Sequence, residues 1–406
     1  MVSDTASRGT VDWDEGHFGR GTNQSGMRDA NERLVLSLVR RHGSLSKTDL
    51  ARMTGLSAQT VSVIMRELEA EELLVRGDPI RGKVGQPSVP LALNPDGAYF
   101  LGLKIGRRSA DLVLVDFLGR VRENRGLAYD YPSPEGTVGF VNDSVPGMAA
   151  TLTLEQQKRI AGLGIAMPFE LWNWGDTVGA PVDIMNRWRD ADIRAEIASH
   201  YPFPVYVQND ATAACGAELV FGDTGGLRDF LYFYIGSFIG GGIVLNGAVY
   251  AGRTGNAGAL GSMPVPGHDG KPHQLIDIAS LAALERTLNA AGHDASFLWT
   301  SPSVWDLENA ELRTWISSAG AGIAYAVMAS ASVVDFEAAV IDGWLPETIR
   351  SRIVTAVGEA LQAFDREGIT TPAITAGTVG IHARALGGAC LPLFDRFLTQ
   401  QRLSKD

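Results

Sequence analysis

The side chains with the clearest chemical role lie in a short polar segment. Its hydroxyl and amide groups can each donate and accept hydrogen bonds, and they belong to Ser57, Gln59, Thr60 and Ser62. A glutamine in such a position can pair through two hydrogen bonds with an adenine edge in the major groove of DNA. Positive charges suited to phosphate groups follow at Arg66, Arg81 and Lys83. This set predicts contact with both the bases and the backbone of double-stranded DNA.

Three predicted helices position these side chains. Apolar residues at helical spacing predict a first helix over residues 31–41, which ends at His42-Gly43. A second helix begins near Ser46, whose hydroxyl can cap it, and stops before the turn at residues 54–57. The third begins at Ser57 and carries an apolar face at Val61, Ile64, Met65 and Leu68. The last two helices form a helix-turn-helix unit, in which the second enters the major groove with its N-terminus first.

A hairpin is predicted directly after the third helix. Residues 73–76 favour a strand, residues 77–85 a turn that carries Arg81 and Lys83, and residues 88–93 a returning strand. This arrangement is a wing, so residues 29–94 are predicted to be a winged helix-turn-helix domain. The alternative is an ordinary three-helix domain with a solvated basic loop. Helix length, turn position and wing all agree with the DNA-binding interpretation.

The charge of the chain is unevenly distributed. The net charge is −11, which by itself argues against a nucleic-acid binder. Residues 32–87, however, carry nine basic and seven acidic residues, a net charge of +2 that leaves −13 for the rest. A small basic module on an acidic body is typical of a regulator.

Length and composition set limits on the architecture. At 406 residues the chain should hold two or three domains, since one domain takes roughly 150 residues. No segment approaches the roughly 20 apolar residues of a membrane span, and residues 1–28 are predicted to be a disordered tail without a secretion signal. We therefore expect a cytoplasmic protein. Cys215 and Cys390 are the only cysteines, which excludes a disulfide framework or a cysteine-based zinc cluster.

Residues 95–406 have the pattern of an α/β domain. Strands at residues 100–105, 110–116 and 120–129 predict an antiparallel meander, and alternating strands and helices follow. The same theme begins again after Asp229. We therefore expect two similar lobes, one over about residues 95–211 plus the C-terminal helix and the other over about residues 212–378.

Glycine-rich motifs give this domain a family resemblance. In chain order they are GLGIAMP at residues 162–168, AP at 180–181 with Trp188, VQNDA at 207–211, a glycine-rich stretch at 236–247, GNAG at 255–258 and GGA at 387–389. This set resembles the ROK family, which contains xylose and N-acetylglucosamine repressors together with bacterial hexokinases of actin-like fold. The resemblance implies a two-lobed, actin-like sugar-kinase fold behind the winged helix-turn-helix.

The expected ATP site departs from the kinase pattern. The kinases that this chain resembles open the first hairpin with an aspartate, an apolar residue and Gly-Gly-Thr, whereas this chain has Lys104 in place of the acid, followed by Arg107 and Arg108. In the second phosphate loop Phe238 stands where a phosphate needs bare backbone. These changes predict that the chain is not a kinase and uses no cofactor.

The sugar site is partly retained. By the resemblance, Asn209 and Asp210 correspond to a hydroxyl ligand and to the general base of the kinases, and with Asn256 they form our predicted effector site. Asp210 could instead simply cap the helix that follows. The family's sugar-gripping glutamate and zinc-binding histidine are replaced by Ala259 and Ser262.

No metal is expected. The cysteine-rich zinc loop of the family is replaced by residues 267–274, in which His268, Asp269 and His273 have no patterned metal-ligand spacing. The wing also departs, since repressors of this family tend to have Gly-Arg-Pro where this chain has Gly85-Gln86-Pro87. Arg81 and Lys83 remain available for phosphates.

These observations together predict a transcriptional regulator. We expect a repressor of carbohydrate uptake or catabolism genes that binds operator DNA as a homodimer or a dimer of dimers and senses a sugar or sugar derivative. One alternative is an active carbohydrate kinase with an added N-terminal module, and another is a regulator controlled by a protein partner. For Lys104 we expect either an ion pair with Asp210 or a side chain that points into solvent.

Overall fold

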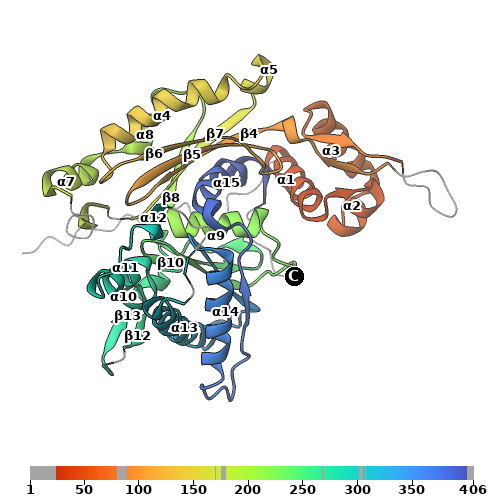
Figure 1. Ribbon diagram of the computed structural model, residues 1–406. Helices are drawn as coiled ribbons and strands as arrows, with labels where there is room; N and C mark the ends of the chain where they lie inside the picture. Colours follow the sequence, from red (N-terminus) through yellow and green to blue (C-terminus); the bar gives the residue numbers. More distant parts are fainter. Residues whose placement is uncertain are drawn as a thin grey trace, which may run out of the picture.

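The computed structural model describes residues 24–79, 89–169, 171–174, 180–267, 269–300, 305–306 and 308–399. A small N-terminal domain lies beside a larger body of two lobes (Figure 1). The first helix, α1, spans Gln24–His42. The predicted disordered tail is therefore wrong for residues 24–28, and the rest of it lies outside the described residues. None of the described helices has the length and apolar composition that a membrane span requires.

The N-terminal domain has the predicted winged helix-turn-helix fold. Helix α2 (Lys47–Thr54) begins with a capping box, in which the Asp49 amide donates to the Ser46 hydroxyl at 3.1 Å. It ends at Gly55, whose φ of 71° lies in the left-handed region that glycine tolerates. Helix α3 spans Ala58–Ala70. Strands β1 (Ser44–Leu45), β3 (Leu91–Leu93) and β2 (Leu74–Arg76) form an antiparallel sheet in that order.

Lobe one is built on a mixed sheet of five strands. In sheet order these are β6 (Val121–Ala128), β5 (Ser109–Asp116), β4 (Tyr99–Ile105), β7 (Ile160–Met167) and β8 (Val205–Asn209). The first three are antiparallel, as predicted, and the last two run parallel to β4. Helices α4 (Pro134–Ala149) and α8 (Ile193–Ala198) cover one face, and α5 (Leu154–Gln157) and α7 (Val182–Asp190) lie at the periphery (Figure 1).

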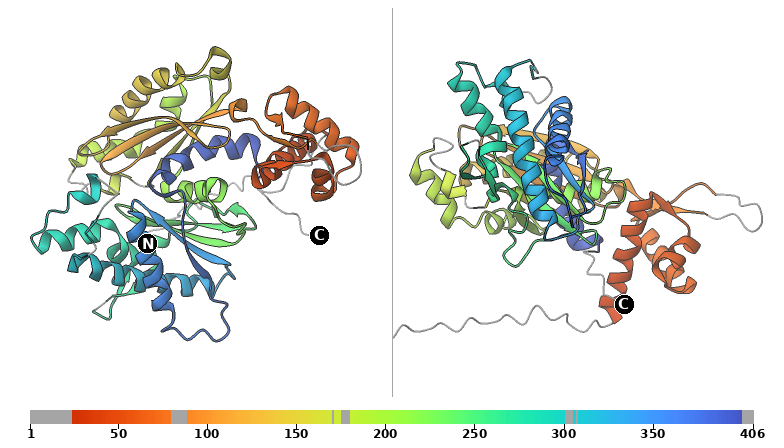
Figure 2. Two further views of the ribbon diagram at one scale, coloured as in Figure 1. Left: turned by 45° about the vertical axis from the view of Figure 1, so that its right-hand side comes forward. Right: turned by 90° about the horizontal axis from the view of Figure 1, so that it is seen from below.

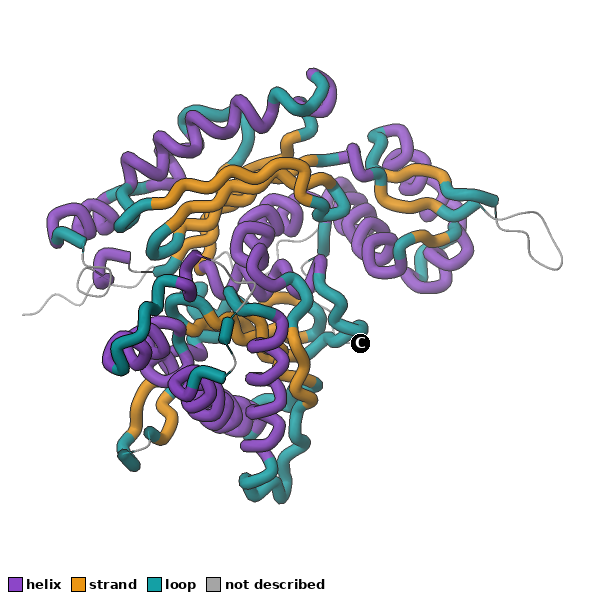
Figure 3. Tube along the Cα trace, viewed as in Figure 1, coloured by secondary structure: helices purple, strands orange, loops and turns teal. Residues whose placement is uncertain are grey.

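Lobe two repeats this arrangement. Its sheet has the order β11 (Ala248–Val249), β10 (Ile239–Leu245), β9 (Phe230–Ile235), β14 (Ala338–Gly343) and β15 (Ala373–Ala376). Again three antiparallel strands are followed by two parallel ones. Two similar lobes are therefore present, as the sequence predicts, and their sheets form separate layers in Figure 3.

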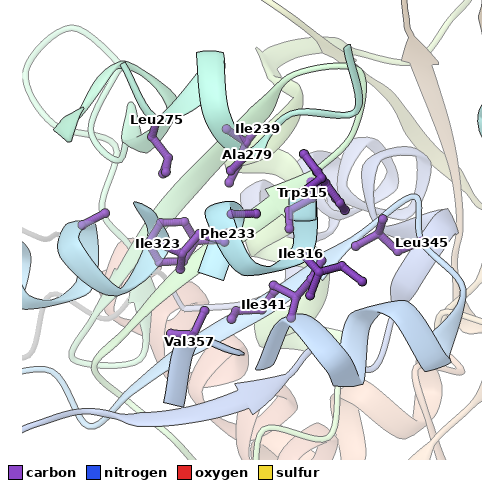
Figure 4. Close-up of a cluster of buried hydrophobic side chains, with 14 of the residues drawn as sticks. Phe233, Ile239, Leu275, Ala279, Trp315, Ile316, Ile323, Ile341, Leu345 and Val357 are labelled. Carbon is purple, nitrogen blue, oxygen red and sulfur yellow. The ribbon is translucent and has the colours of Figure 1, made fainter. Parts of the chain in front are cut away.

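Helices cover the outer side of the second sheet. They are α10 (Leu275–Ala279), α11 (Leu281–Ala290), α12 (Phe297–Thr300), α13 (Ala310–Ala331) and α14 (Glu347–Leu361), with a small hairpin of β12 (Pro264–Pro266) and β13 (Pro272–Gln274) beside them. Figure 4 shows how Phe233 and Ile341 of the sheet meet Trp315 and Ile323 of α13. All are buried, so this core fixes the outer wall of lobe two.

Two helices fill the space between the sheets. Helix α9 (Asp210–Phe221) packs against β10, and α15 (Ala383–Phe397) packs against β4, β7 and α9 (Figure 2). The contact with the sheet is unusually close because glycines face the helix. A Cβ on Gly102 would lie 2.1 Å from the carbonyl oxygen of Ala385, and one on Gly164 would lie 1.9 Å from that of Gly388. Helix α15 is thereby held rigidly against lobe one.

The N-terminal domain is joined to lobe one by a shared apolar core. Val35 and Val39 of α1 belong to the same buried cluster as Phe100 and Phe117 of lobe one and Phe397 of α15. Polar contacts add to it at both ends of the interface. The Thr399 amide donates to the Ser37 hydroxyl at 3.1 Å, and Arg159 pairs with Glu72. The N-terminal domain is therefore packed against the body and not merely tethered to it.

Candidate DNA-binding and ligand-binding sites

The recognition helix α3 is capped by its own polar residues. The Ser57 hydroxyl accepts a hydrogen bond from the Thr60 amide at 3.0 Å and lies 2.8 Å from the Thr60 hydroxyl. Ser57 is thus the N-cap residue, and the first residues of the helix are exposed to solvent. Gln59 and Arg66 are exposed and Ser62 is half-buried. The structure therefore brings the predicted DNA-contacting residues of α3 onto one surface, with two of the hydroxyls already bonded to each other.

The wing is described only at its base. Strand β2 pairs with β3 over Leu74–Arg76, and Arg76 donates to Glu69 of α3 at 3.0 Å. Arg81 and Lys83, which we predict to lie near phosphates, fall outside the described residues, and so do Gln86 and Pro87. Their contribution to DNA binding stays a prediction.

A cleft of about 1230 Å³ lies between the two lobes. Residues from both lobes and from α15 form its wall, which includes the three predicted effector-binding residues, Asn209, Asp210 and Asn256. Aromatic side chains also line it, at Phe169, Trp172, Trp188, Tyr234 and Phe238. A concave site with apolar walls and a few convergent polar groups is the usual form of a small-molecule site.

Asn209 has a structural partner at the start of α9. Its side-chain oxygen accepts hydrogen bonds from the amides of Ala211 and Thr212, at 3.0 and 3.2 Å. The helix cap that we considered for Asp210 is therefore provided by Asn209. Asp210 is instead the first residue of α9, where a negative charge is favoured by the helix dipole.

Asp210 is paired with an arginine that the sequence analysis did not identify. Arg384 of α15 donates to its carboxylate at 3.2 Å, and both side chains are largely buried. The guanidinium also lies over the ring of Tyr234, 5.0 Å from its centroid. Burial raises the pKa of Tyr234 to about 12, so this phenol stays protonated at neutral pH. The Asp210 carboxylate, the expected general base, is thus already engaged by a buried guanidinium.

Lys104 is buried, and its carboxylate partner is Asp111 instead of the expected Asp210. Its ammonium lies 2.8 Å from the Asp111 carboxylate and donates to the Ser109 hydroxyl at 2.8 Å. Both expectations for Lys104 were therefore wrong, because Asp210 pairs with Arg384 and the lysine is only 7% exposed. The cause is the hairpin register, which places Lys104 directly opposite Asp111. Burial lowers the pKa of Lys104 to about 8.

The arginines of the first hairpin connect the two lobes. Arg107 lies 3.1 Å from the Glu285 carboxylate of α11, and Arg108 lies 3.8 Å from it. The Trp299 indole donates to the same carboxylate at 2.8 Å, and both guanidinium groups lie within about 6 Å of its ring. These residues were expected to obstruct phosphate binding, and in the structure they form an ion-pair cluster across the lobes.

The glycines of the second loop are used for packing. A Cβ on Gly240 would lie 2.8 Å from the Ala211 side chain, and one on Gly242 would lie 2.5 Å from Cys215. Strand β10 can therefore approach α9 closely. Phe238 lies in the preceding turn and lines the cleft. This close packing explains the glycines without a phosphate ligand.

In the described part of the expected zinc loop, a histidine is hydrogen-bonded to an aspartate. His273 lies 2.9 Å from Asp269, and both side chains are exposed. Within the described residues, no three or more histidine, cysteine or acidic side chains are grouped to hold a metal. His268 lies outside the described part of the chain.

Comparison with known proteins identifies both parts of the chain. A model of the winged helix-turn-helix DNA-binding domain matches residues 28–75, so the N-terminal unit belongs to this class of DNA-binding domains. The ROK family model matches residues 100–391, and the chain therefore belongs to the ROK family. The predicted family and fold are confirmed.

Relatives include regulators. The chain is 27% identical over 371 residues to an uncharacterised protein of Sinorhizobium fredii, with 91% of this chain and 92% of that protein covered. It is 27% identical to a putative xylose repressor of Caldicellulosiruptor, over 68% of this chain and 71% of the relative. It is 26% identical to the xylose repressor of Bacillus subtilis, over 60% of this chain and 62% of that repressor.

Solved structures support the same fold. A ROK family transcriptional regulator, homologous to the Escherichia coli MLC protein, superposes with a TM-score of 0.64 at 20% identity and covers 90% of this chain and 96% of its own. A ROK family glucokinase from Streptomyces griseus superposes with a TM-score of 0.55 at 23% identity, over 72% of this chain and 99% of the kinase. The kinase aligns with less of the chain because the shared architecture is that of the two lobes.

Proposed function

We propose that this protein is a sequence-specific transcriptional regulator that represses genes of carbohydrate uptake or catabolism and responds to a sugar or sugar derivative in the interlobe cleft. The observation that carries the proposal is the position of α15. At its start Arg384 contacts Asp210 in the cleft, and at its end Phe397 packs into the core shared with α1 of the DNA-binding domain. One helix therefore contacts both the cleft and the domain that carries the predicted DNA-contacting residues.

Allosteric control needs two sites and an element whose position both can bias. A ligand that binds beside Asp210 can change the partner of Arg384 and the separation of the lobes. Because glycine contacts hold α15 against lobe one, the helix and lobe one would move together relative to lobe two. That movement reaches α1 through Phe397 and through the hydrogen bond between Ser37 and Thr399.

The proposed regulator has no sugar-kinase activity. Three charged groups support this part of the proposal. Lys104 is buried in an ion pair, Arg384 is bound to Asp210, and Arg107 is bound to Glu285. A kinase would need metal and phosphate groups close to this region, and a general base that accepts a proton.

A carbohydrate kinase is the second candidate, because Asp210 is retained in the cleft. Coupled measurement of ATP consumption with a panel of hexoses and pentoses distinguishes the two. We expect no sugar-dependent turnover. Turnover near the roughly 1–100 s⁻¹ that is usual for kinases would overturn the assignment, and stoichiometric zinc in elemental analysis would contradict the absence of a metal site.

Genome-wide mapping of bound sites tests the regulator directly. We expect enrichment upstream of carbohydrate transport or catabolic genes. The bound sequence should be roughly palindromic, since helix-turn-helix proteins commonly bind DNA as dimers. The purified protein is then titrated onto the enriched sequence with and without sugars, beginning with D-xylose because two relatives are xylose repressors. Absence of any enriched sequence would reject the proposed function. A sequence bound equally with every sugar would favour control by a protein partner.

A further inference from the structure

The outward face of the recognition helix carries an apolar side chain between two polar ones. Gln59, Val63 and Arg66 follow one another at helical spacing, so they lie on one face of α3. The opposite face is buried, at Val61, Ile64, Met65 and Leu68. Val63 is 38% exposed, so its side chain is accessible to a ligand on this face.

The hydroxyls near the start of α3 are less available for base contacts. Ser57 and Thr60 bind each other in the helix cap, at 2.8 Å between their oxygens. The exposed face of α3, opposite its buried residues, carries Gln59, Val63 and Arg66. It includes an apolar contact that the sequence analysis did not identify.

The charges around this face suit DNA. The acidic residues in the second half of α3 already have basic partners, since Glu67 lies 2.9 Å from Arg28 and Glu69 accepts from Arg76. The N-terminus of the helix adds positive partial charge at the end that enters the groove. Arg66 is exposed beside Val63 and adds a full positive charge.

The major groove offers one apolar group to such a side chain, the 5-methyl group of thymine. We propose that Val63 contacts a thymine methyl group in each half-site and thereby makes thymine a requirement beside the base pair read by Gln59. This inference rests on the proposed function as a DNA-binding regulator. It adds Val63 as a specificity-determining residue and predicts the chemical group that it recognises.

The experiment removes the methyl group from the DNA. The full-length protein first selects its preferred duplex from a random pool, and each thymine is then replaced singly by deoxyuridine, which differs only by that methyl group. Fluorescence anisotropy gives the Kd for the wild type and for Val63→Ala. The variant should fold, because alanine favours helices more than valine does and the site is exposed. Circular dichroism checks this.

For the wild type, we expect one thymine position per half-site at which deoxyuridine weakens binding by about 3- to 5-fold, the effect of losing one buried methyl group. Val63→Ala should weaken binding to the thymine duplex by a similar factor and should bind the thymine and deoxyuridine duplexes equally. Val333→Ala changes an exposed valine of lobe two and should retain the full sensitivity of the wild type.

Two negative outcomes are distinguishable. If the pool yields a preferred duplex but the wild type and Val63→Ala respond alike to every deoxyuridine, the contact is refuted and the DNA-binding function remains. If no duplex is enriched, the proposed function fails and the contact fails with it.

Discussion

Arg107 of lobe one and Glu285 of lobe two form an ion pair of 3.1 Å, with both side chains mostly buried. The pair connects the turn after β4, which belongs to lobe one, to helix α11, which belongs to lobe two. It therefore restrains the separation of the lobes, and hence the shape of the cleft between them.

Loss of this pair should release the restraint. We expect Glu285→Gln to lower the free energy of unfolding by about 1.5–3 kcal/mol, the range for a hydrogen bond to a charged group. The radius of gyration from small-angle scattering should also increase. Glu155→Gln breaks an exposed pair with Lys158 and should change neither quantity measurably. An unchanged radius for Glu285→Gln would show that the lobes are held by other contacts.

Lys104 should make stability depend on pH. The pKa of Lys104 falls from 10.5 in the unfolded chain to about 8 in the folded protein. Below pH 8 the buried lysine is charged, and the cost of burying this charge destabilises the folded protein in full. As the pH rises from 8 to 10.5, the folded protein releases the proton first and the unfolded chain binds more protons. The free energy of unfolding therefore rises with pH in this window.

A variant isolates this effect. Relative to Lys104→Met, the wild type should gain about 1–2 kcal/mol of stability between roughly pH 7.5 and pH 9.5, measured by denaturant titration. Lys158→Met removes an exposed lysine and controls for the loss of a lysine side chain as such. A constant difference for Lys104→Met would contradict the lowered pKa.

Arg40 should couple the DNA-binding domain to the body. The Arg40 guanidinium donates to the carbonyl oxygen of Phe117 and lies 5.4 Å from the centre of the Phe117 ring. Burial lowers the pKa of Arg40 to about 10. We expect Arg40→Met to keep DNA binding within a few-fold while reducing the response to the cleft ligand, as measured by anisotropy with and without the ligand.

The control for this variant is Arg313→Met, an exposed residue of lobe two. It should leave both DNA binding and the ligand response intact. A normal ligand response in Arg40→Met would mean that the signal reaches α1 by another route.

Gln59 and Arg66 should contribute to DNA binding in different ways. Gln59→Ala should cost about 1–3 kcal/mol on the preferred duplex and little on random DNA, because a base contact is specific. Arg66→Ala should weaken binding to all duplexes and reduce the salt dependence by about one phosphate contact. The Kd values at several salt concentrations separate the two effects. Equal losses on specific and random DNA for Gln59→Ala would contradict its assignment as a base-reading residue.

Local patterns in the sequence predicted much of the fold. The helix-turn-helix follows from apolar spacing around Val61 and Ile64 and from the turn at Gly55, which are features of neighbouring residues. Strand β14 was not identified, although all its residues are buried, because a short apolar run has no periodicity that distinguishes a strand from a helix.

The ion pairs were harder to predict because their members are distant in sequence. Asp210 and Arg384 are 174 positions apart, and Arg107 and Glu285 are 178 apart. The hairpin register could have identified the Lys104–Asp111 pair, since a short turn fixes which residues face each other. Arg384 also gave a signal, as an arginine in a segment otherwise rich in small residues, three positions before the GGA motif begins.

The position of α15 has a consequence for the synthesis of the protein. Its residues follow both lobes in the chain, yet they complete the core that lobe one shares with the DNA-binding domain. Until the ribosome has released them, Phe100 and Phe117 have no Phe397 to pack against, and the tight glycine surface at Gly102 and Gly164 is uncovered. Domains generally begin to fold during translation, but this one cannot finish until α15 is made. A prematurely terminated chain would expose apolar surface to chaperones and proteases, so only full-length molecules would carry a correctly docked DNA-binding domain.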